Sequence, residues 1–322
     1  MKMIKGTWFE FRHHNKAEGK YWNPVCRKFT ESQWRTKIRE MRGLGMEYLV
    51  LLCTSLVYTD YAEAYFETDI YPFPEDMVCK DPIEVLLDEC DKQGMKVFMS
   101  CGYYGPCTNA YKNMVSPEVT ALAFKAMEQL WEKFGTHKSF YGWYYPDETG
   151  ADGYFHEDFI TYVNTYGEYI HRLAPGTKTL IAPYGTRKIV ADEKYIDQLR
   201  RMDVDFVAYQ DEVGVRKSTP EETGAYFKAL REAHDKAGKS AIWADVELFG
   251  FEGDVYRSAL IPSDMERVEK QLKAVAPYVD VILCYQYLGM MNAPSTEAYC
   301  GHPDSVKLYE DYESFVKRAE NE

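Results

Sequence analysis

Short apolar segments alternate with longer amphipathic segments along the whole chain. The apolar segments are rich in β-branched and aromatic residues, as buried strands are, and they read MIKGTWFEF, MEYLVLLC, KVFMSCGYY, SFYGWYYPDE, KTLIAPYG, VDFVAYQDEVG, SAIWADVELFG and VDVILCYQYLG. Segments with apolar residues at helical spacing follow them, over residues 31–44, 82–93, 117–134, 157–173, 193–201, 220–237, 264–276 and 303–318. The pattern predicts eight strand–helix units in succession.

Local signals mark the ends of the predicted helices. Proline stands in the first helical turn in SPEV, TPEE and HPDS, with an acidic residue close behind. At these positions a missing N–H costs nothing and a negative charge complements the helix dipole. Glycine stands just past a helix end in RGLGM, DKQGM and DKAGK, where a left-handed backbone is common. These signals agree with the periodicity.

Strands that are apolar on both faces and alternate with helices indicate a parallel sheet covered by helices. Eight units in 322 residues favour an α/β fold of the closed (β/α)8 TIM barrel type over an open doubly wound sheet. The glycine-rich fingerprint that a nucleotide-binding open sheet carries after its first strand is absent from the sequence. No linker or low-complexity tract interrupts the series, so we expect one domain over residues 1–322.

Charge and cysteine usage narrow the partners. The chain has 51 acidic and 38 basic residues, a net charge of -13, which disfavours nucleic acid and anionic membrane surfaces and favours a neutral or cationic substrate. The sequence has no uncharged apolar window near the roughly 18 residues of a membrane span, and its first residues lack the features of a signal peptide. The eight cysteines follow no disulfide or metal spacing. We therefore expect reduced thiols in a cytoplasmic protein, or an exported one whose signal peptide is missing here.

In a (β/α)8 barrel the active site is built at the carboxyl ends of the strands. The residues that the sequence places there are mostly acids, tyrosines and amides. They are Glu10, Arg12 and His13 after the first strand, Tyr104 after the third, Asp147 and Glu148 after the fourth, Tyr184 after the fifth, Gln210 and Asp211 after the sixth, Asp245 and Glu247 after the seventh, and Tyr285 and Tyr287 after the eighth.

Paired carboxylates beside aromatic residues suit glycoside hydrolysis. One carboxylic acid protonates the departing oxygen, while a second carboxylate attacks the anomeric carbon or activates water. Strands four and seven lie nearly opposite each other in an eight-stranded barrel, so Glu148 and Glu247 are the leading catalytic pair. The other strand-end residues are candidates for binding a sugar, with tyrosines as stacking surfaces. The chemistry requires neither a cofactor nor a metal ion.

Structural roles compete with these assignments. Glu148 could cap the following helix, because acids are favoured at helix N-termini. Asp245 lies on the same strand face as Glu247 and could be the nucleophile or a partner that orients Glu247. Adjacent strand residues point opposite ways, so only one of Asp211 and Glu212 should face the site. Arg12 could form a purely structural ion pair, and some of the tyrosines must be ordinary core residues.

The motifs GWYYPDE, YQDEVG and WADVELF, together with an N-terminal GTWFEF, resemble those of a largely uncharacterised, glycosidase-like bacterial barrel family frequent in gut Bacteroidetes. The positions of Glu148 and Glu247 also resemble those of the large clan of retaining glycosidases, which carry an acid/base glutamate on strand four and a nucleophile on strand seven. In that clan asparagine usually precedes the acid/base residue, whereas Asp147 does so here. The resemblance implies a sugar-related site with roles for Glu148, Asp211 and Glu247.

Two other function classes stay open. A metal-dependent sugar isomerase or epimerase would also use a barrel with an acid-rich mouth, and it would need histidine and carboxylate ligands around a divalent cation. A carbohydrate-binding barrel without catalysis would need the aromatic and acidic residues but no working acid–base pair. A metal assay and a pH–rate profile would separate these classes from a hydrolase.

Overall fold

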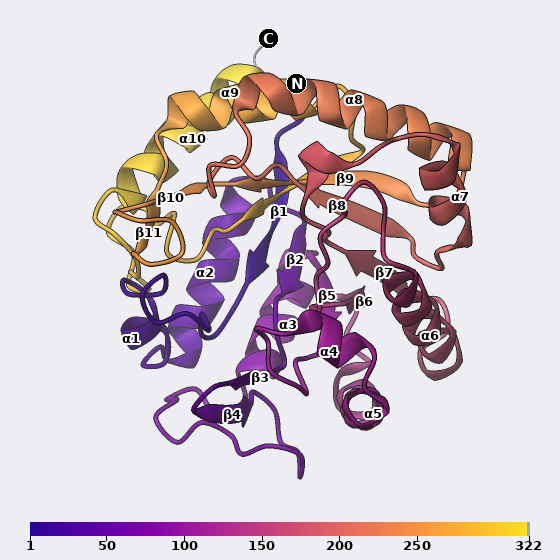
Figure 1. Cartoon of the computed structure of the whole chain (residues 1–322). Helices are drawn as coiled ribbons and strands as arrows, with labels where there is room; N and C mark the ends of the chain where they lie inside the picture. The colour runs from indigo at the N-terminus through magenta and orange to yellow at the C-terminus, as the bar shows by residue number, and fades with distance from the viewer. Residues whose placement is uncertain (321–322) are drawn as a thin grey trace.

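Eight parallel strands form a closed barrel at the centre of the computed structural model, which describes residues 1–320 (Figure 1). Around the barrel the order is β1, β2, β5, β6, β7, β8, β9 and β12. Their bounds are β1 Ile4–Phe9, β2 Tyr48–Leu51, β5 Lys96–Ser100, β6 Phe140–Tyr144, β7 Lys178–Ile181, β8 Phe206–Gln210, β9 Ala241–Glu247 and β12 Val281–Tyr285. The prediction of a (β/α)8 barrel from the sequence is confirmed.

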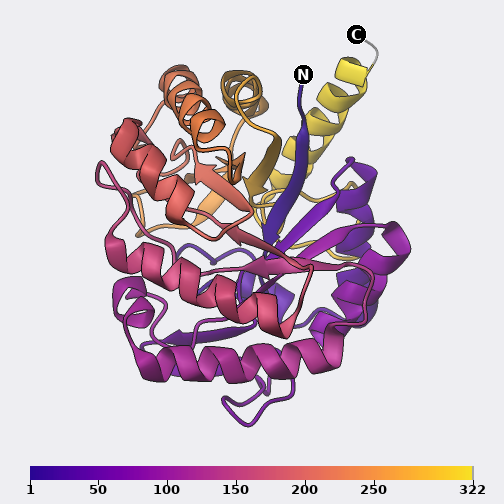
Figure 2. The same cartoon turned by 90° about the vertical axis from the view of Figure 1, so that its right-hand side faces the viewer.

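One long helix follows each barrel strand and packs on the outside of the sheet, as the view down the side of the molecule makes plain (Figure 2). Their bounds are α2 Glu31–Gly43, α3 Pro82–Gln93, α5 Pro117–Phe134, α6 Glu157–Leu173, α7 Glu193–Arg201, α8 Pro220–Ala237, α9 Met265–Val275 and α10 Ser305–Glu320. Thr30 and Gln33 form a capping box at the start of α2. Gly94 ends α3 with φ 65°, a conformation that glycine adopts without strain.

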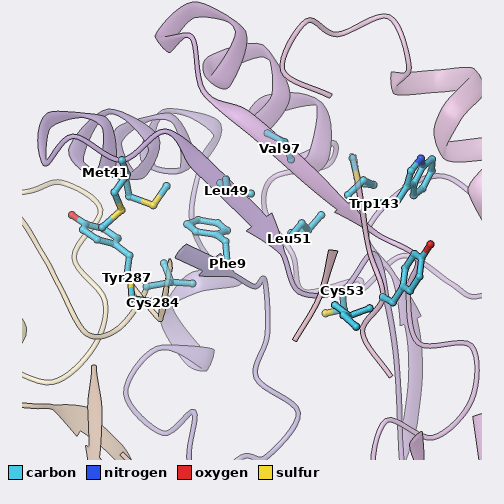
Figure 3. Close-up of a cluster of buried hydrophobic side chains, with 14 of the residues drawn as sticks. Phe9, Met41, Leu49, Leu51, Cys53, Val97, Trp143, Cys284 and Tyr287 are labelled. Atoms are coloured by element: carbon cyan, nitrogen blue, oxygen red, sulfur yellow. The ribbon is translucent and has the colours of Figure 1, made fainter. Parts of the chain in front are cut away.

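Alternation along each strand divides the apolar side chains into two cores. Val50 of β2 points into the barrel with Trp8 and Leu283, whereas Leu49 and Leu51 point outward to the helices. Figure 3 shows the outer core, in which these two leucines lie beside Phe9 and near Met41 of α2. Because successive strand residues face opposite sides, the position of a residue relative to the inner core indicates whether it faces the barrel interior.

The loops after the strands contain short elements that the hydrophobic pattern did not predict. They are α1 Asn23–Cys26, β3 Ser55–Tyr58, β4 Tyr61–Ala64, α4 Ala110–Met114, the 3-10 helix η1 Thr186–Lys188, β10 Phe249–Phe251 and β11 Leu260–Pro262. β3 pairs with β4, and β10 with β11, as antiparallel hairpins. The first hairpin lies in the loop between β2 and α3, and the second in the loop between β9 and α9. No helix within residues 1–320 has the length and apolar character needed to cross a membrane.

Candidate active site

A pocket of about 420 Å³ opens at the carboxyl ends of the barrel strands, which is within the size range of ligand sites. Nine of the strand-end residues selected from the sequence line it. They are Glu10, Arg12, His13, Glu148, Tyr184, Gln210, Asp245, Glu247 and Tyr285. The pocket therefore gathers side chains from the ends of six strands of the barrel, including both members of the leading catalytic pair.

Glu148 follows β6 and is held by two hydrogen bonds. The Tyr144 hydroxyl, which rises from the inner core of the barrel, donates to Glu148 Oε1 at 2.7 Å, and Gln210 Nε2 donates to Oε2 at 2.7 Å. Burial raises the pKa of Glu148 to about 7, although both hydrogen bonds act in the opposite direction. A carboxyl group with such a pKa holds a proton near neutral pH, as a general acid must.

Glu247 is the last residue of β9 and lies beside Tyr285 in the sheet register. The backbone N–H of Val215 donates to Glu247 Oε2 at 2.8 Å. The backbone carbonyl of Glu247 accepts a bond of 2.9 Å from Arg267 Nη2 of α9, so both ends of the residue are fixed. Burial, and then the nearby charge of Asp211, raise the pKa of Glu247 to about 8.

Asp245 lies two residues before Glu247 on the same strand face and pairs in register with Gln210. It lines the bottom of the pocket above Trp243, which belongs to the inner core. Its Oδ1 atom has no hydrogen-bond partner among residues 1–320. Burial, followed by the charge of Glu247, holds the pKa of Asp245 well above its ordinary value. Burial of Asp245 therefore favours the protonated form of its carboxyl group.

His13, in the loop after β1, forms a charged cluster at the pocket. Its Nδ1 lies 3.1 Å from Glu10 Oε1, and its Nε2 lies 3.0 Å from Glu18 Oε2. Tyr285 Oη lies 3.1 Å from the same Nδ1. Burial opposes a charge on His13, but the two carboxylates outweigh it and raise the pKa to about 10. The positively charged His13 ring consequently fixes the orientation of Glu10 and offsets part of the negative charge of Glu10 and Glu18.

The turn after β8 reverses one expectation. Asp211 does not line the pocket: its carboxylate accepts bonds from Gln271 Nε2 at 2.7 Å and from the Glu247 backbone N–H at 3.2 Å. Glu212 lines the pocket instead. Its φ of 55° is left-handed, and this uncommon conformation for glutamate is typical of functional turns. Asp211 thus supports Glu247 from behind, while Gln210 and Glu212 face the site.

Three further residues selected from the sequence lie outside the pocket. Asp147 is buried beside Asn113, whose Nδ2 donates to its Oδ1 at 2.8 Å. Tyr104 is buried against Tyr71, with ring centroids 6.0 Å apart. The Tyr287 hydroxyl donates to Glu40 Oε2 of α2 at 2.8 Å, because the chain turns outward after β12. Contrary to the prediction from the sequence, these three side chains do not line this pocket.

Other residues also line the pocket. Leaving Glu212 aside, the polar ones are His14, Glu18, Tyr103, Lys217 and Tyr256. The HH pair after the first strand and the YY pair after the third placed His14 and Tyr103 at strand ends. The other three come from loops, and the sequence reasoning did not select them. Burial, and then the charge of His13, lower the pKa of His14 to about 4, so His14 faces the pocket as a neutral imidazole.

Arg12 combines a structural and a site role. Its Nη1 lies 3.2 Å from Glu63 Oε2 of β4, and its guanidinium lies 3.7 Å from the centre of the Tyr61 ring. Arg12 thereby fixes the β3–β4 hairpin against the pocket that it also lines. Within the part of the chain that the structure describes, there is no group of three or more histidine, cysteine, aspartate or glutamate side chains placed to hold a metal ion.

The fold and the pocket define a (β/α)8 barrel with a carboxylate-rich site at the carboxyl ends of its strands. The chain belongs to the family described as "Domain of unknown function (DUF4434)", whose model matches residues 4–298. This match confirms the family resemblance found in the sequence motifs. No curated protein matches the chain.

Solved structures with the same barrel include glycoside hydrolases. A candidate alpha-L-fucosidase from Bacteroides thetaiotaomicron VPI-5482 has a TM-score of 0.74 at 18% identity, over 98% of this chain and 93% of that chain. An endo-1,4-beta-mannanase from Rhizomucor miehei has a TM-score of 0.59 at 12% identity, over 98% and 95%. A beta-galactosidase from Marinomonas ef1 has a TM-score of 0.60 at 9% identity, and the chain spans 60% of its length. At these identities the likeness shows the fold.

Proposed function

We propose that the protein is a glycoside hydrolase. The observation that carries the proposal is the position of Glu148 and Glu247, which come from strands three places apart in the barrel order and line the same pocket. Two carboxyl groups that flank one cavity are what glycosidic bond cleavage needs. The glycoside hydrolases among the structural neighbours support this class.

In the proposed mechanism Glu148 is the general acid and base. Because its pKa is raised to about 7, the Glu148 carboxyl group can donate a proton to the glycosidic oxygen as the bond to the anomeric carbon breaks. Tyr144 and Gln210 orient its two oxygens. After the leaving group departs, the same carboxylate takes a proton from the water that attacks the anomeric carbon.

Glu247 is the proposed nucleophile of a retaining reaction. Its ionised oxygen attacks the anomeric carbon and forms a covalent glycosyl ester, which the activated water then hydrolyses. The N–H of Val215 stabilises the carboxylate. The charges of Asp211 and Glu212 oppose ionisation of Glu247. The charge of an ionised Glu247 in turn raises the pKa of Asp245, which favours a proton on Asp245 while Glu247 is ionised. A protonated Asp245 can bond a sugar hydroxyl.

The test is turnover of a panel of aryl α- and β-glycosides by the wild type, Glu148→Gln and Glu247→Gln. Glu132→Gln is the matched control, because Glu132 is exposed on the outer helix α5. We expect both site variants to lose at least 100-fold in kcat/KM with the thermal midpoint unchanged, since general acid–base catalysis alone contributes about 10²–10⁴-fold. Proton NMR of the first-formed anomer then decides between retention and inversion. A site variant as active as the control would refute the assignment.

A further inference from the structure

A second hollow of about 440 Å³ adjoins the pocket on the side of the loop that precedes α4. Four residues line both cavities, and Glu148 is one of them, together with His14, Tyr103 and Tyr184. Glu247 and Asp245 line only the first cavity. Glu148 therefore lies on the boundary between two spaces of similar volume, with the proposed nucleophile on one side.

The position of a general acid defines the two halves of its substrate. The glycosidic oxygen receives the proton. This oxygen links two parts of the substrate: the sugar that contains the reacting anomeric carbon, and the leaving group. The reacting sugar must lie with Glu247 in the first cavity. The leaving group then lies beyond Glu148, which is the direction of the second hollow.

We infer that the second hollow is a binding subsite for a leaving group that is itself a sugar unit. This inference rests on the proposed hydrolase function and adds the substrate class: a disaccharide, an oligosaccharide or a glycan, rather than a glycoside of a small alcohol. Both cavities, at about 420 and 440 Å³, are of the size that binds a small ligand.

The walls of the hollow have the character of a sugar site. Tyr111 at the start of α4 is 56% exposed and Tyr184 is 41% exposed, which makes their ring surfaces accessible. The Tyr111 hydroxyl donates to Asp158 Oδ2 at 2.9 Å, and its ring packs edge-on against His156 at 5.6 Å. These contacts hold the exposed Tyr111 ring in place. Because the ring is already fixed, less side-chain rotamer entropy is lost on binding than with an unrestrained tyrosine.

Polar groups surround the two aromatic rings. The exposed Thr108 and Asn109 and the partly buried Thr149 line the same hollow, and their hydroxyl and amide groups suit the hydroxyls of a sugar. An apolar ring face for stacking, with uncharged hydrogen-bonding groups at its edge, matches a carbohydrate better than an ionic or fully apolar group.

The experiment compares two substrates that share a reacting sugar. One set contains the α- and β-fluorides of galactose, glucose, mannose and L-fucose, whose leaving group has no atom to place in the hollow and needs no proton. The other contains disaccharides with the same non-reducing sugars and anomeric configurations. The variants are Tyr111→Ala and Tyr111→Phe. Tyr299→Ala is the control, since Tyr299 is 41% exposed and lines neither cavity.

We expect Tyr111→Ala to lower kcat/KM for the disaccharide about tenfold and to change kcat/KM for the matching fluoride less than twofold. Tyr111→Phe keeps the ring and should retain most of the disaccharide activity, and Tyr299→Ala should equal the wild type on both substrates. Equal losses on fluoride and disaccharide, or no loss on the disaccharide with an unchanged thermal midpoint, would overturn the subsite while the hydrolase function stands. A wild type that cleaves no fluoride and no disaccharide would overturn both.

Discussion

Gln210 of β8 donates a 2.7 Å hydrogen bond to Glu148 after β6 and a second, of 3.1 Å, to the backbone carbonyl of Ala182 after β7. A single amide therefore joins the ends of three neighbouring strands and fixes the candidate acid. Because this bond stabilises the carboxylate form, it keeps the pKa of Glu148 lower than burial alone would make it. The role of Gln210 is positioning, in addition to any contact with a sugar.

Replacing Gln210 tests that role. We expect Gln210→Met to raise the apparent pKa of the limb that Glu148 governs in the pH profile of kcat/KM, and to lower kcat/KM by about tenfold because a positioned acid is lost. The measurement is the full pH profile on one cleaved glycoside. Gln93→Met on the outer helix α3 is the control, and a profile of Gln210→Met that matches the control would contradict the positioning role.

The carboxyl pair predicts a bell-shaped pH profile centred near neutrality. The pKa values of about 7 for Glu148 and about 8 for Glu247 lie well above the ordinary values of about 4 for carboxyl groups. Activity needs Glu148 protonated and Glu247 ionised. Because the pKa of Glu148 is the lower of the two, this form is a minor, constant fraction of the singly protonated enzyme. Activity should therefore still rise with pH through the lower pKa and fall through the higher one. We expect the maximum of kcat/KM between about pH 7 and 8. An optimum near pH 4 to 5 would show that burial in the substrate-free pocket does not determine the pKa values of Glu148 and Glu247 during catalysis.

Rescue by azide separates a retaining mechanism from an inverting one. Glu148→Ala removes the base of the second step but leaves a cavity at the anomeric carbon, so added azide should attack the glycosyl ester on Glu247. We expect azide to raise kcat of Glu148→Ala at least tenfold on an aryl glycoside with a good leaving group. The expected product is a glycosyl azide of retained configuration. Glu247→Ala should instead give an azide of inverted configuration. The absence of any azide product from Glu148→Ala would argue against retention.

Much of the architecture could be predicted from the sequence, since strand composition and helical spacing repeat eight times. The barrel rule then placed Glu148, Asp245 and Glu247 at the pocket. Asp245 and Glu247 belong to the end of β9, and Glu148 follows shortly after β6, which ends at Tyr144. The rule failed in the turn after β8. After β8 the φ of 55° at Glu212 turns the side chain of Glu212, rather than that of Asp211, toward the pocket. No residue type in the sequence QDEVG predicts this backbone conformation.

Loop structure limited the prediction in a second way. Tyr287 was selected as a strand-end residue, but β12 ends at Tyr285 and the chain then runs outward, so the ring packs toward α2 and Glu40. Conversely, Lys217 and Glu18 reach the pocket from loops, and their positions depend on contacts between segments far apart in the sequence. Hydrophobic periodicity carries no information on such contacts.

A buried histidine outside the site predicts a loss of stability in acid. His234 of α8 lies 2.9 Å from the Tyr209 hydroxyl through Nε2 and 3.0 Å from the Ser240 carbonyl through Nδ1, an arrangement that suits the neutral ring. Burial lowers the pKa of His234 to about 4, below the ordinary value of about 6.5. The unfolded chain therefore binds one proton more than the folded protein between about pH 4 and 6.5, so stability must rise with pH across this window and be lost as pH falls.

The difference in pKa corresponds to about 3 kcal/mol of unfolding free energy lost between pH 6.5 and 4. Urea unfolding of the wild type and His234→Gln across this range measures it, since glutamine can accept from Tyr209 and donate to Ser240 without titrating. We expect His234→Gln to be somewhat less stable at pH 7 but to show a pH slope smaller by up to one proton. His171→Gln, at an exposed position of α6, is the control. Equal slopes in His234→Gln and the wild type would mean that the pKa of His234 is the same in the folded and unfolded protein, which would contradict the prediction.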